Sequence, residues 1–185
     1  MDRVEQLLEA YRDRVTRPWP RGISGPERVW MAVYPPEIER RLRVRIPEFG
    51  LATADAGRRW RHLDLTTAFA DWLGVHERRE RYFEDPDAMK PAYKGFETAV
   101  EARVRAVLTA DDTDADTVVA LSGVGALFPM LHVSKLVGDV APDVRGRLLV
   151  FFPGSFEHGN YRLLDARDGW NYLAIPITIA EGSSR

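Results

Sequence analysis

The stretch LSGVGALFPMLHVSK, residues 121–135, holds residues whose types and spacing could bind a phosphate group. Gly123 and Gly125 follow a run of β-branched residues, and a Ser-Lys pair stands downstream. A Walker-type loop requires a second glycine five positions after the first, followed by Lys and then Ser or Thr. A dinucleotide-binding fingerprint requires its third glycine at the same place, position 128. Phe128 stands there, and Lys135 follows Ser134 in the wrong order. We therefore interpret the two glycines as a strand-to-helix turn.

A second candidate for chemistry is the stretch FPGSFEHG, residues 152–159, in which Ser155 lies close to His158. A nucleophile elbow requires glycines two positions before and two positions after the serine. Pro153 and Glu157 occupy those positions. We interpret the stretch as a proline-glycine turn that leaves a buried strand.

Metal binding has a weaker basis in the sequence. The chain has no cysteine, and its four histidines, at positions 62, 76, 132 and 158, show no ligand spacing. Glu157, Asp165 and Asp168 could gather around the 153–159 turn and bind a divalent cation through oxygen atoms. Asp168-Gly169 is also what a hairpin turn requires. No catalytic, cofactor-binding or metal-ligating residue is assigned.

Arginines form two clusters. One contains Arg40, Arg41, Arg43 and Arg45, and the other contains Arg78, Arg79 and Arg81. Glutamates are interleaved with both, which favours solvated helix faces with local ion pairs, the alternative being a surface for an acidic partner. Only three of the 26 basic residues are lysine, which indicates either GC-rich codon usage or an arginine interaction surface. A net charge of -2 makes direct DNA contact an unfavoured reading.

The elements that must position these side chains alternate between helix and strand. Hydrophobic periodicity predicts helices over 2–15, 35–49 (kinked or restarted at Pro47), 66–73 (capped by Thr66), 76–82, 96–108 and 127–137. Apolar runs predict strands over 29–34, 60–65, 117–121 and 147–152. Strands over 161–165 and 172–177, joined by a turn at Asp168-Gly169, predict a C-terminal hairpin. The acidic loop 110–116 is the least structured link expected.

This order predicts an α/β fold with a mainly parallel sheet of about five strands, helices on both faces and a C-terminal β-hairpin. The 185 residues are interpreted as one domain, with an α/β core over 28–178 and a flexible tail over 180–185. Hydrophobic residues make up 45% of the chain and charged residues 29%, as in ordinary globular proteins. No signal peptide and no membrane-spanning run is visible, so we expect a cytoplasmic protein.

Five stretches resemble the BrxB family of small proteins encoded in bacteriophage exclusion (BREX) gene clusters. They are RVWMAVYPPEIERRL (28–42), DLTTAFADWL (64–73), ERRERYFEDP (77–86), RLLVFFPG (147–154) and NYRLLDARDGWNYLAIPI (160–177). The resemblance implies a role in bacterial antiviral defence beside the alkaline-phosphatase-like protein PglZ, the ATPase BrxC and an adenine-specific DNA methyltransferase. It implies no catalytic residue. By analogy, the fold resembles a nucleotide-binding fold without a phosphate loop.

The leading hypothesis is therefore a non-catalytic adaptor of a BREX complex that acts through protein-protein contacts. PglZ is the first expected partner, BrxC and the methyltransferase are others, and a homodimer is left open. Aromatic and arginine side chains are the candidate contacts: Trp19, Arg40, Arg41, Arg78, Arg79, Trp170 and Tyr172. One alternative is a nucleotide- or metal-dependent enzyme that uses residues 122–129 and 153–159. The other is a DNA-binding accessory protein.

Overall fold

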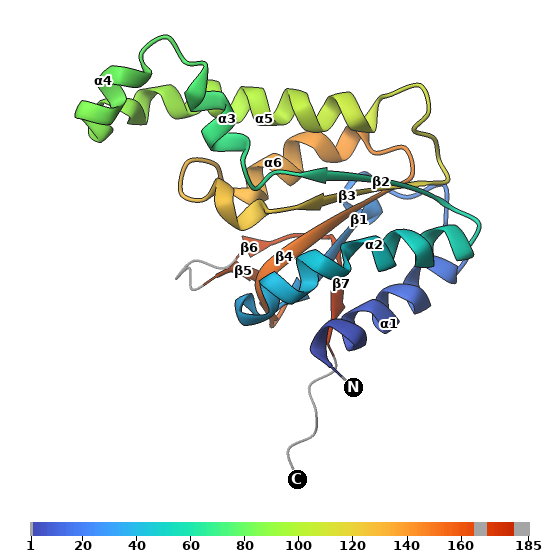
Figure 1. The fold of residues 1–185 in the computed structure, drawn as a ribbon. Coiled ribbons are helices and arrows are strands. Elements are labelled where there is room, and N and C mark those ends of the chain that lie inside the picture. Colours follow the sequence, from blue (N-terminus) through green and yellow to red (C-terminus); the bar gives the residue numbers. More distant parts are fainter. Residues whose placement is uncertain (1, 165–169, 180–185) are drawn as a thin grey trace.

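A parallel sheet forms the centre of the computed structural model, which describes residues 2–164 and 170–179 (Figure 1). Its strands are β1 (Val29–Tyr34), β2 (Arg59–Asp64), β3 (Thr117–Ser122), β4 (Arg147–Glu157) and β7 (Ile175–Thr178). They lie in the order β2-β3-β4-β1-β7, and every neighbouring pair in this order is parallel. All residues of β1 and β3 are buried, which explains why these strands are continuous apolar runs.

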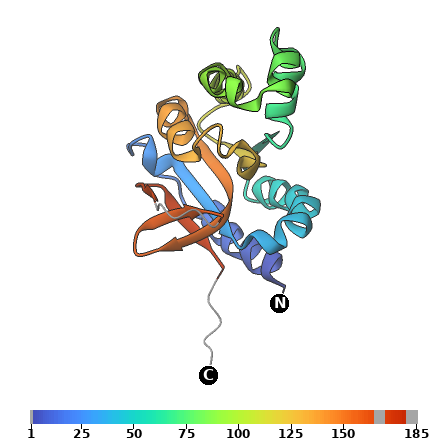
Figure 2. The same cartoon turned by 90° about the vertical axis from the view of Figure 1, so that its left-hand side faces the viewer.

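Helices cover both faces of the sheet, as predicted. Helices α1 (Arg3–Thr16) and α2 (Glu39–Asp55) pack on one face. Helices α3 (Ala68–Gly74), α5 (Tyr93–Leu108) and α6 (Val133–Val140) pack on the other. Figure 2, which looks at the carboxyl ends of the strands, shows α1 and α2 on one side of β1 and β4 and α6 on the opposite side. Helix α4 (Arg79–Glu84) projects past the end of the sheet (Figure 1).

The C-terminal strands form a hairpin, but their arrangement differs from the prediction. The second half of β4 pairs antiparallel with β5 (Asn160–Leu163), and β5 pairs with β6 (Trp170–Asn171). The single strand predicted over 172–177 is wrong, because residues 172–174 leave the hairpin and β7 joins β1 in parallel. The predicted turn at Asp168-Gly169 and the predicted tail 180–185 lie outside the described residues.

Three helix predictions need correction. Helix α2 runs through Pro47 as one element, so the helix does not restart there. Thr66 does not cap α3, since its hydroxyl and amide donate to Asp64 Oδ1 at 2.5 and 2.9 Å. The helix predicted over 127–137 begins only at Val133, because Pro129 holds Phe128 in an extended conformation. A 3-10 helix, η4 (Val124–Leu127), precedes this break.

The acidic segment 110–116 is a loop without helix or strand, as predicted, and arginine side chains bond to it. Arg59 pairs with Asp114 at 3.1 Å, Arg61 pairs with Asp112, and Arg58 pairs with Asp116. Arg145 donates to the carbonyl oxygens of Ala110 and Thr113 at 3.2 and 2.9 Å. Arginines at the starts of β2 and β4 therefore hold the loop against the amino ends of the strands.

Candidate functional site

The glycine turn after β3 has no room for a phosphate. Gly123 has φ +74, and a Cβ at that position would meet the amide nitrogen and hydroxyl of Thr66 and the carboxylate of Asp64. Burial acts to raise the pKa of Asp64, but hydrogen bonds from Thr66, with Arg43 and His62 nearby, outweigh it and lower that pKa. A charged carboxylate therefore occupies the place where a phosphate would lie. Val124 and Leu127 beside it are fully buried.

A hydrogen-bonded serine and histidine do meet at this edge of the sheet, and the sequence patterns did not identify them. His62 Nε2 lies 2.8 Å from Ser122 Oγ, because β2 and β3 are parallel neighbours. Such a pair is the core of many nucleophilic sites. Ser122, however, is only 3% exposed, and its carbonyl oxygen accepts the Leu65 amide at 2.9 Å. We interpret the pair as a structural contact between two strands.

His62 should make the stability of the protein depend on pH. Burial lowers the pKa of His62 below its ordinary value of 6.5, and the nearby Asp64 carboxylate only partly opposes this. Below pH 6.5 the unfolded chain therefore binds more protons than the folded protein does. The contribution of His62 to the free energy of unfolding is complete above pH 6.5 and is lost as the pH falls through the lowered pKa of the folded state. The His62→Gln variant keeps a polar group but does not titrate. Between about pH 7 and pH 5, its free energy of unfolding, measured by urea denaturation, should decrease less than that of the wild type. If the free energy of unfolding decreased equally with pH in the two proteins, His62 would not be the cause of the pH dependence.

The stretch 153–159 is mostly strand rather than a turn. Strand β4 continues to Glu157, Ser155 lies opposite Arg162 of β5, and His158 and Gly159 form the hairpin tip with positive φ. A hollow of about 650 Å³ opens beside it, at the carboxyl ends of β1, β4 and β7. Asp165 and Asp168, predicted to join Glu157 in a cation site, lie outside the described residues.

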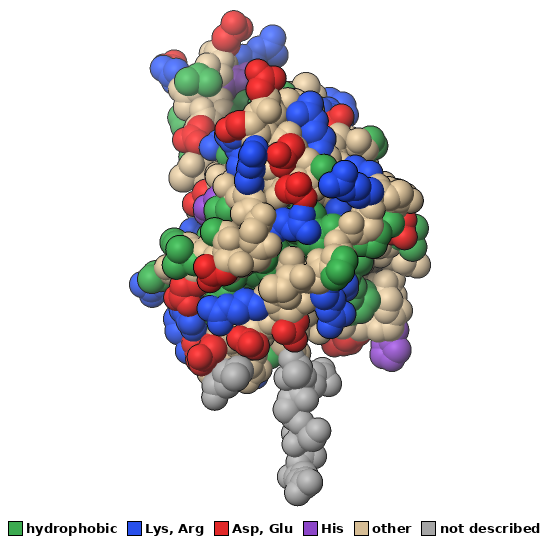
Figure 3. Space-filling model, turned by 90° about the vertical axis from the view of Figure 1, so that its right-hand side faces the viewer, with side chains coloured by type: hydrophobic (Ala, Val, Ile, Leu, Met, Phe, Trp, Pro, Cys, Tyr) green, Lys and Arg blue, Asp and Glu red, His purple; other side chains and the backbone are tan. Residues whose placement is uncertain are grey.

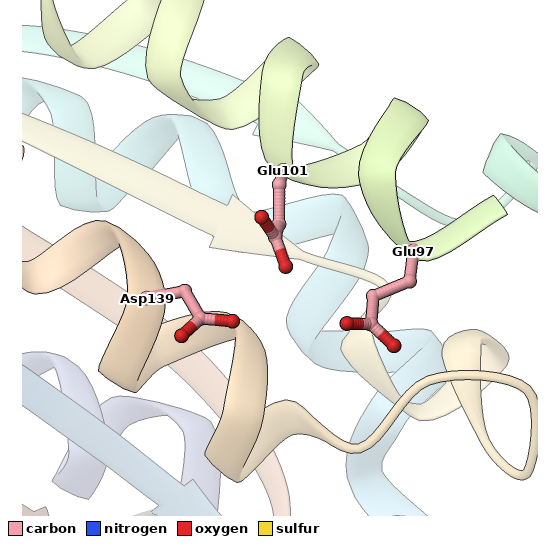
Figure 4. Close-up of side chains that lie close together, drawn as sticks. All are labelled: Glu97, Glu101 and Asp139. Atoms are coloured by element: carbon pink, nitrogen blue, oxygen red, sulfur yellow. The ribbon is translucent and has the colours of Figure 1, made fainter. Parts of the chain in front are cut away.

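An acidic cluster elsewhere could be mistaken for a metal site. Glu97 and Glu101 on α5 face Asp139 on α6 (Figure 4). The ammonium group of Lys135 lies 2.5 Å from Glu97 and 3.3 Å from Glu101, and it also pairs with Asp139. Asp139, Glu97 and Glu101 together raise the pKa of Lys135. The cluster is therefore an ion-pair network between α5 and α6 in which lysine supplies the cation.

The predicted aromatic anchors are packed against the protein itself. The ring of Trp19 lies edge-on to Trp30, with centroids 5.5 Å apart, and the guanidinium groups of Arg58 and Arg147 lie 4.3 and 4.8 Å from its centroid. The ring centroids of Trp170 and Tyr172 are 4.8 Å apart, and both rings pack against the core beneath α5 and α6. All three are half-buried.

The predicted arginine contacts lie on two separate elements. Arg40 and Arg41 are exposed on α2, where Arg41 pairs with Asp2 at 3.1 Å. The local pairing expected there is confirmed for Arg43 with Glu39 and for Arg45 with Glu48, each at 2.7 Å. Arg78 and Arg79 are exposed at the start of α4, where Arg79 donates to the Gly74 carbonyl at 3.0 Å. The structure does not bring the two clusters together.

Arg78 and Arg79 belong to a projecting segment, residues 75–92, which we call the arm. It contains α4 and the 3-10 helix η3 (Pro86–Ala92) and extends beyond the sheet (Figure 1). Within this segment Tyr82 alone is buried, and its ring packs on His76, which packs on Trp72. Val75 is 81% exposed and Phe83 68% exposed. The arm thus presents apolar side chains to solvent among charged ones.

Sequence reasoning also missed a group of arginines at the amino ends of the strands. Arg28, Arg58 and Arg147 stand at or just before the first residues of β1, β2 and β4, and Arg145 lies close by. Because the amino ends of parallel strands meet at one edge of a sheet, arginines in these positions must converge. The predicted strands 29–34 and 60–65 directly follow an arginine and 147–152 begins with one, which is the signal that could have revealed them.

Comparison with known proteins identifies the family of this chain. No curated protein and no solved structure matches the chain. No helix among the described residues is long and apolar enough to cross a bilayer. A family model described as "BREX protein BrxB" matches residues 77–177, which is more than half of the sequence and includes β3, β4, the hairpin and most of the arm. The chain therefore belongs to the BrxB family, whose members are components of BREX antiphage systems.

Proposed function

We propose that this protein is a non-catalytic adaptor of a BREX complex and that the arm is its contact surface. PglZ is the first partner to test, followed by BrxC and the methyltransferase. The observation that carries the proposal is the exposure of Val75 and Phe83 on a segment that stands away from the sheet. Exposed apolar side chains that form one patch rimmed by polar residues are typical of surfaces that bind other proteins.

The charges of the arm suit a specific contact. Five acidic and four basic residues lie within residues 75–92: Glu77, Arg78, Arg79, Glu80, Arg81, Glu84, Asp85, Asp87 and Lys90. Lys90 pairs with Asp87 at 2.8 Å. Arg78 and Arg79 flank the apolar side chains and can form bidentate bonds to carboxylates of a partner. Trp19, Trp170 and Tyr172, which pack within the fold, are secondary candidates, as are Arg40 and Arg41.

The Phe83→Asp variant tests the proposal in cells that express the whole gene cluster. Introducing a charge into an apolar contact should reduce the amount of PglZ that co-purifies by about tenfold or more. Phe83 is 68% exposed, so the substitution should leave the fold unchanged. Val44→Asp is the matched control, because Val44 is equally apolar and 80% exposed but lies on α2.

Equal recovery of BREX components with wild type and with Phe83→Asp would refute the arm as the contact surface. If Val44→Asp, and not Phe83→Asp, reduced the recovery of BREX components, the contact surface would lie on α2 instead of the arm. Migration of the wild-type protein as a lone species in a lysate that holds all components would refute the adaptor function itself.

A further inference from the structure

A cavity of about 470 Å³ lies at the amino ends of the strands, at the opposite end of the sheet from the glycine turn. Figure 3 looks onto this end of the molecule, where Lys and Arg side chains lie on the surface among Asp and Glu side chains. The cavity lining includes five arginines and one acidic residue: Arg21, Arg28, Arg58, Arg145, Arg147 and Asp116. Arg58 pairs with Asp116, which leaves an excess of positive charge.

The arginines are held in place by backbone carbonyl groups. Arg147 is 4% exposed and donates to the carbonyl oxygens of Gly146 and Pro20, at 2.9 and 3.1 Å. Arg28 donates to the carbonyl oxygens of Val144 and Arg21, at 2.8 and 3.1 Å. Carbonyl oxygens orient a guanidinium group but carry no full charge, so they do not neutralise it. The side chains are thus preorganised, and their charge is uncompensated.

Two further observations favour binding of an anion by this group of arginines. Burial, together with the nearby Arg28, Arg58 and Arg14, lowers the pKa of Arg147 to about 10. The Nε atom of Arg28 is buried and has no hydrogen-bond partner within the described part of the chain. Buried charges in proteins are normally paired, because an unpaired one is costly. A bound anion would relieve the repulsion between these guanidinium groups.

We propose that this cavity binds a small anion with two or more phosphate groups, for which a pyrophosphate group is the minimal form. Guanidinium forks match phosphate oxygens bidentately, and these forks come from four separate segments that converge on one site. The volume lies in the lower part of the range of small-molecule sites. The Trp19 ring against Arg58 and Arg147 fixes the position of two of the forks. The site is separate from the arm, so this inference does not depend on the proposed adaptor function.

The test is calorimetric titration of the purified protein with pyrophosphate at low salt. We expect binding that weakens about tenfold to a hundredfold in Arg147→Gln, because one charge-assisted contact is lost. Arg147 is buried, so Arg21→Gln, at an exposed position, provides a variant that should keep the fold and also bind more weakly. Arg40→Gln, an exposed arginine on α2, is the matched control and should bind as wild type does.

Titrations with ATP, inorganic phosphate, a single-stranded oligonucleotide and a glutamate-rich peptide identify the source of the phosphate. Equal or tighter binding of ATP would assign the site to a nucleotide, and weaker binding would assign it to a free polyphosphate. Absence of pyrophosphate binding at millimolar concentration would overturn the proposal. So would equal weakening in Arg40→Gln, or tighter binding of the peptide or the oligonucleotide than of pyrophosphate and ATP.

Discussion

Replacing Gly123 with alanine is expected to lower the free energy of unfolding by about 2–5 kcal/mol. The residue has φ +74, a conformation that alanine adopts only under strain. Its new methyl group would also lie 2.5 Å from the Thr66 amide nitrogen and would collide with the Thr66 hydroxyl. Both costs arise because Asp64 and Thr66 fill the turn. Urea denaturation measures the change directly, and the melting temperature should fall by about 5–15 °C.

Gly125→Ala is the matched control from the same G-x-G stretch. Its added Cβ would lie 3.3 Å from Pro153 Cγ and 3.9 Å from Leu164 Cδ2, and Gly125 does not have a positive φ. We therefore expect a change of less than about 1 kcal/mol. If both alanine variants were as stable as wild type, the close packing of Gly123 against Thr66 would be wrong. The contrast also separates a steric turn from a phosphate loop, in which both glycines would approach a ligand.

Phe49→Ala is expected to destabilise the protein by about 3–5 kcal/mol. Phe49 is fully buried between α2 and the sheet, with its ring centroid 5.3 Å from that of Tyr11 on α1 and 5.0 Å from that of Phe151 on β4. Removal of the ring leaves a cavity where two helices and the sheet meet. Tyr11 also bonds through its hydroxyl to Thr53 at 2.5 Å, which limits how far the neighbours can close the space.

Val44→Ala, on the exposed side of the same helix, should change the free energy of unfolding by less than about 0.5 kcal/mol. Chemical denaturation of the two variants under identical conditions gives the comparison. Similar stabilities for both would mean that α2 does not pack through the face that carries Phe49.

The sheet was predictable because β1, β3 and the first half of β4 are buried on both faces. Such burial favours apolar side chains at most positions, and the runs VWMAVY, TVVALS and RLLVFF are apolar apart from Thr117, Ser122 and Arg147 at their ends. Strand β7 was merged with its neighbours because it has only four residues and its partner β1 lies near the other end of the chain. Periodicity within a short window contains no information about such a pairing.

The candidate sites were less predictable, for a related reason. The His62–Ser122 contact and the arginine cavity arise from strand neighbours, and neither forms a motif along the chain. The arginines of the cavity bond mostly to backbone carbonyls, which any residue can supply, so no complementary acidic pattern marks them. By contrast, the ion pairs of α2 follow helical spacing within one segment, and they could be predicted.

The position of β7 beside β1 has a consequence for biosynthesis. β1 is made early, but the outer edge of its backbone acquires hydrogen-bond partners only when residues 175–178 arrive. A ribosome-bound chain that ends before this point exposes an unpaired apolar edge, which is the feature most prone to pairing with another nascent chain. A truncation before Ile175 therefore removes the protection that this edge has in the finished molecule.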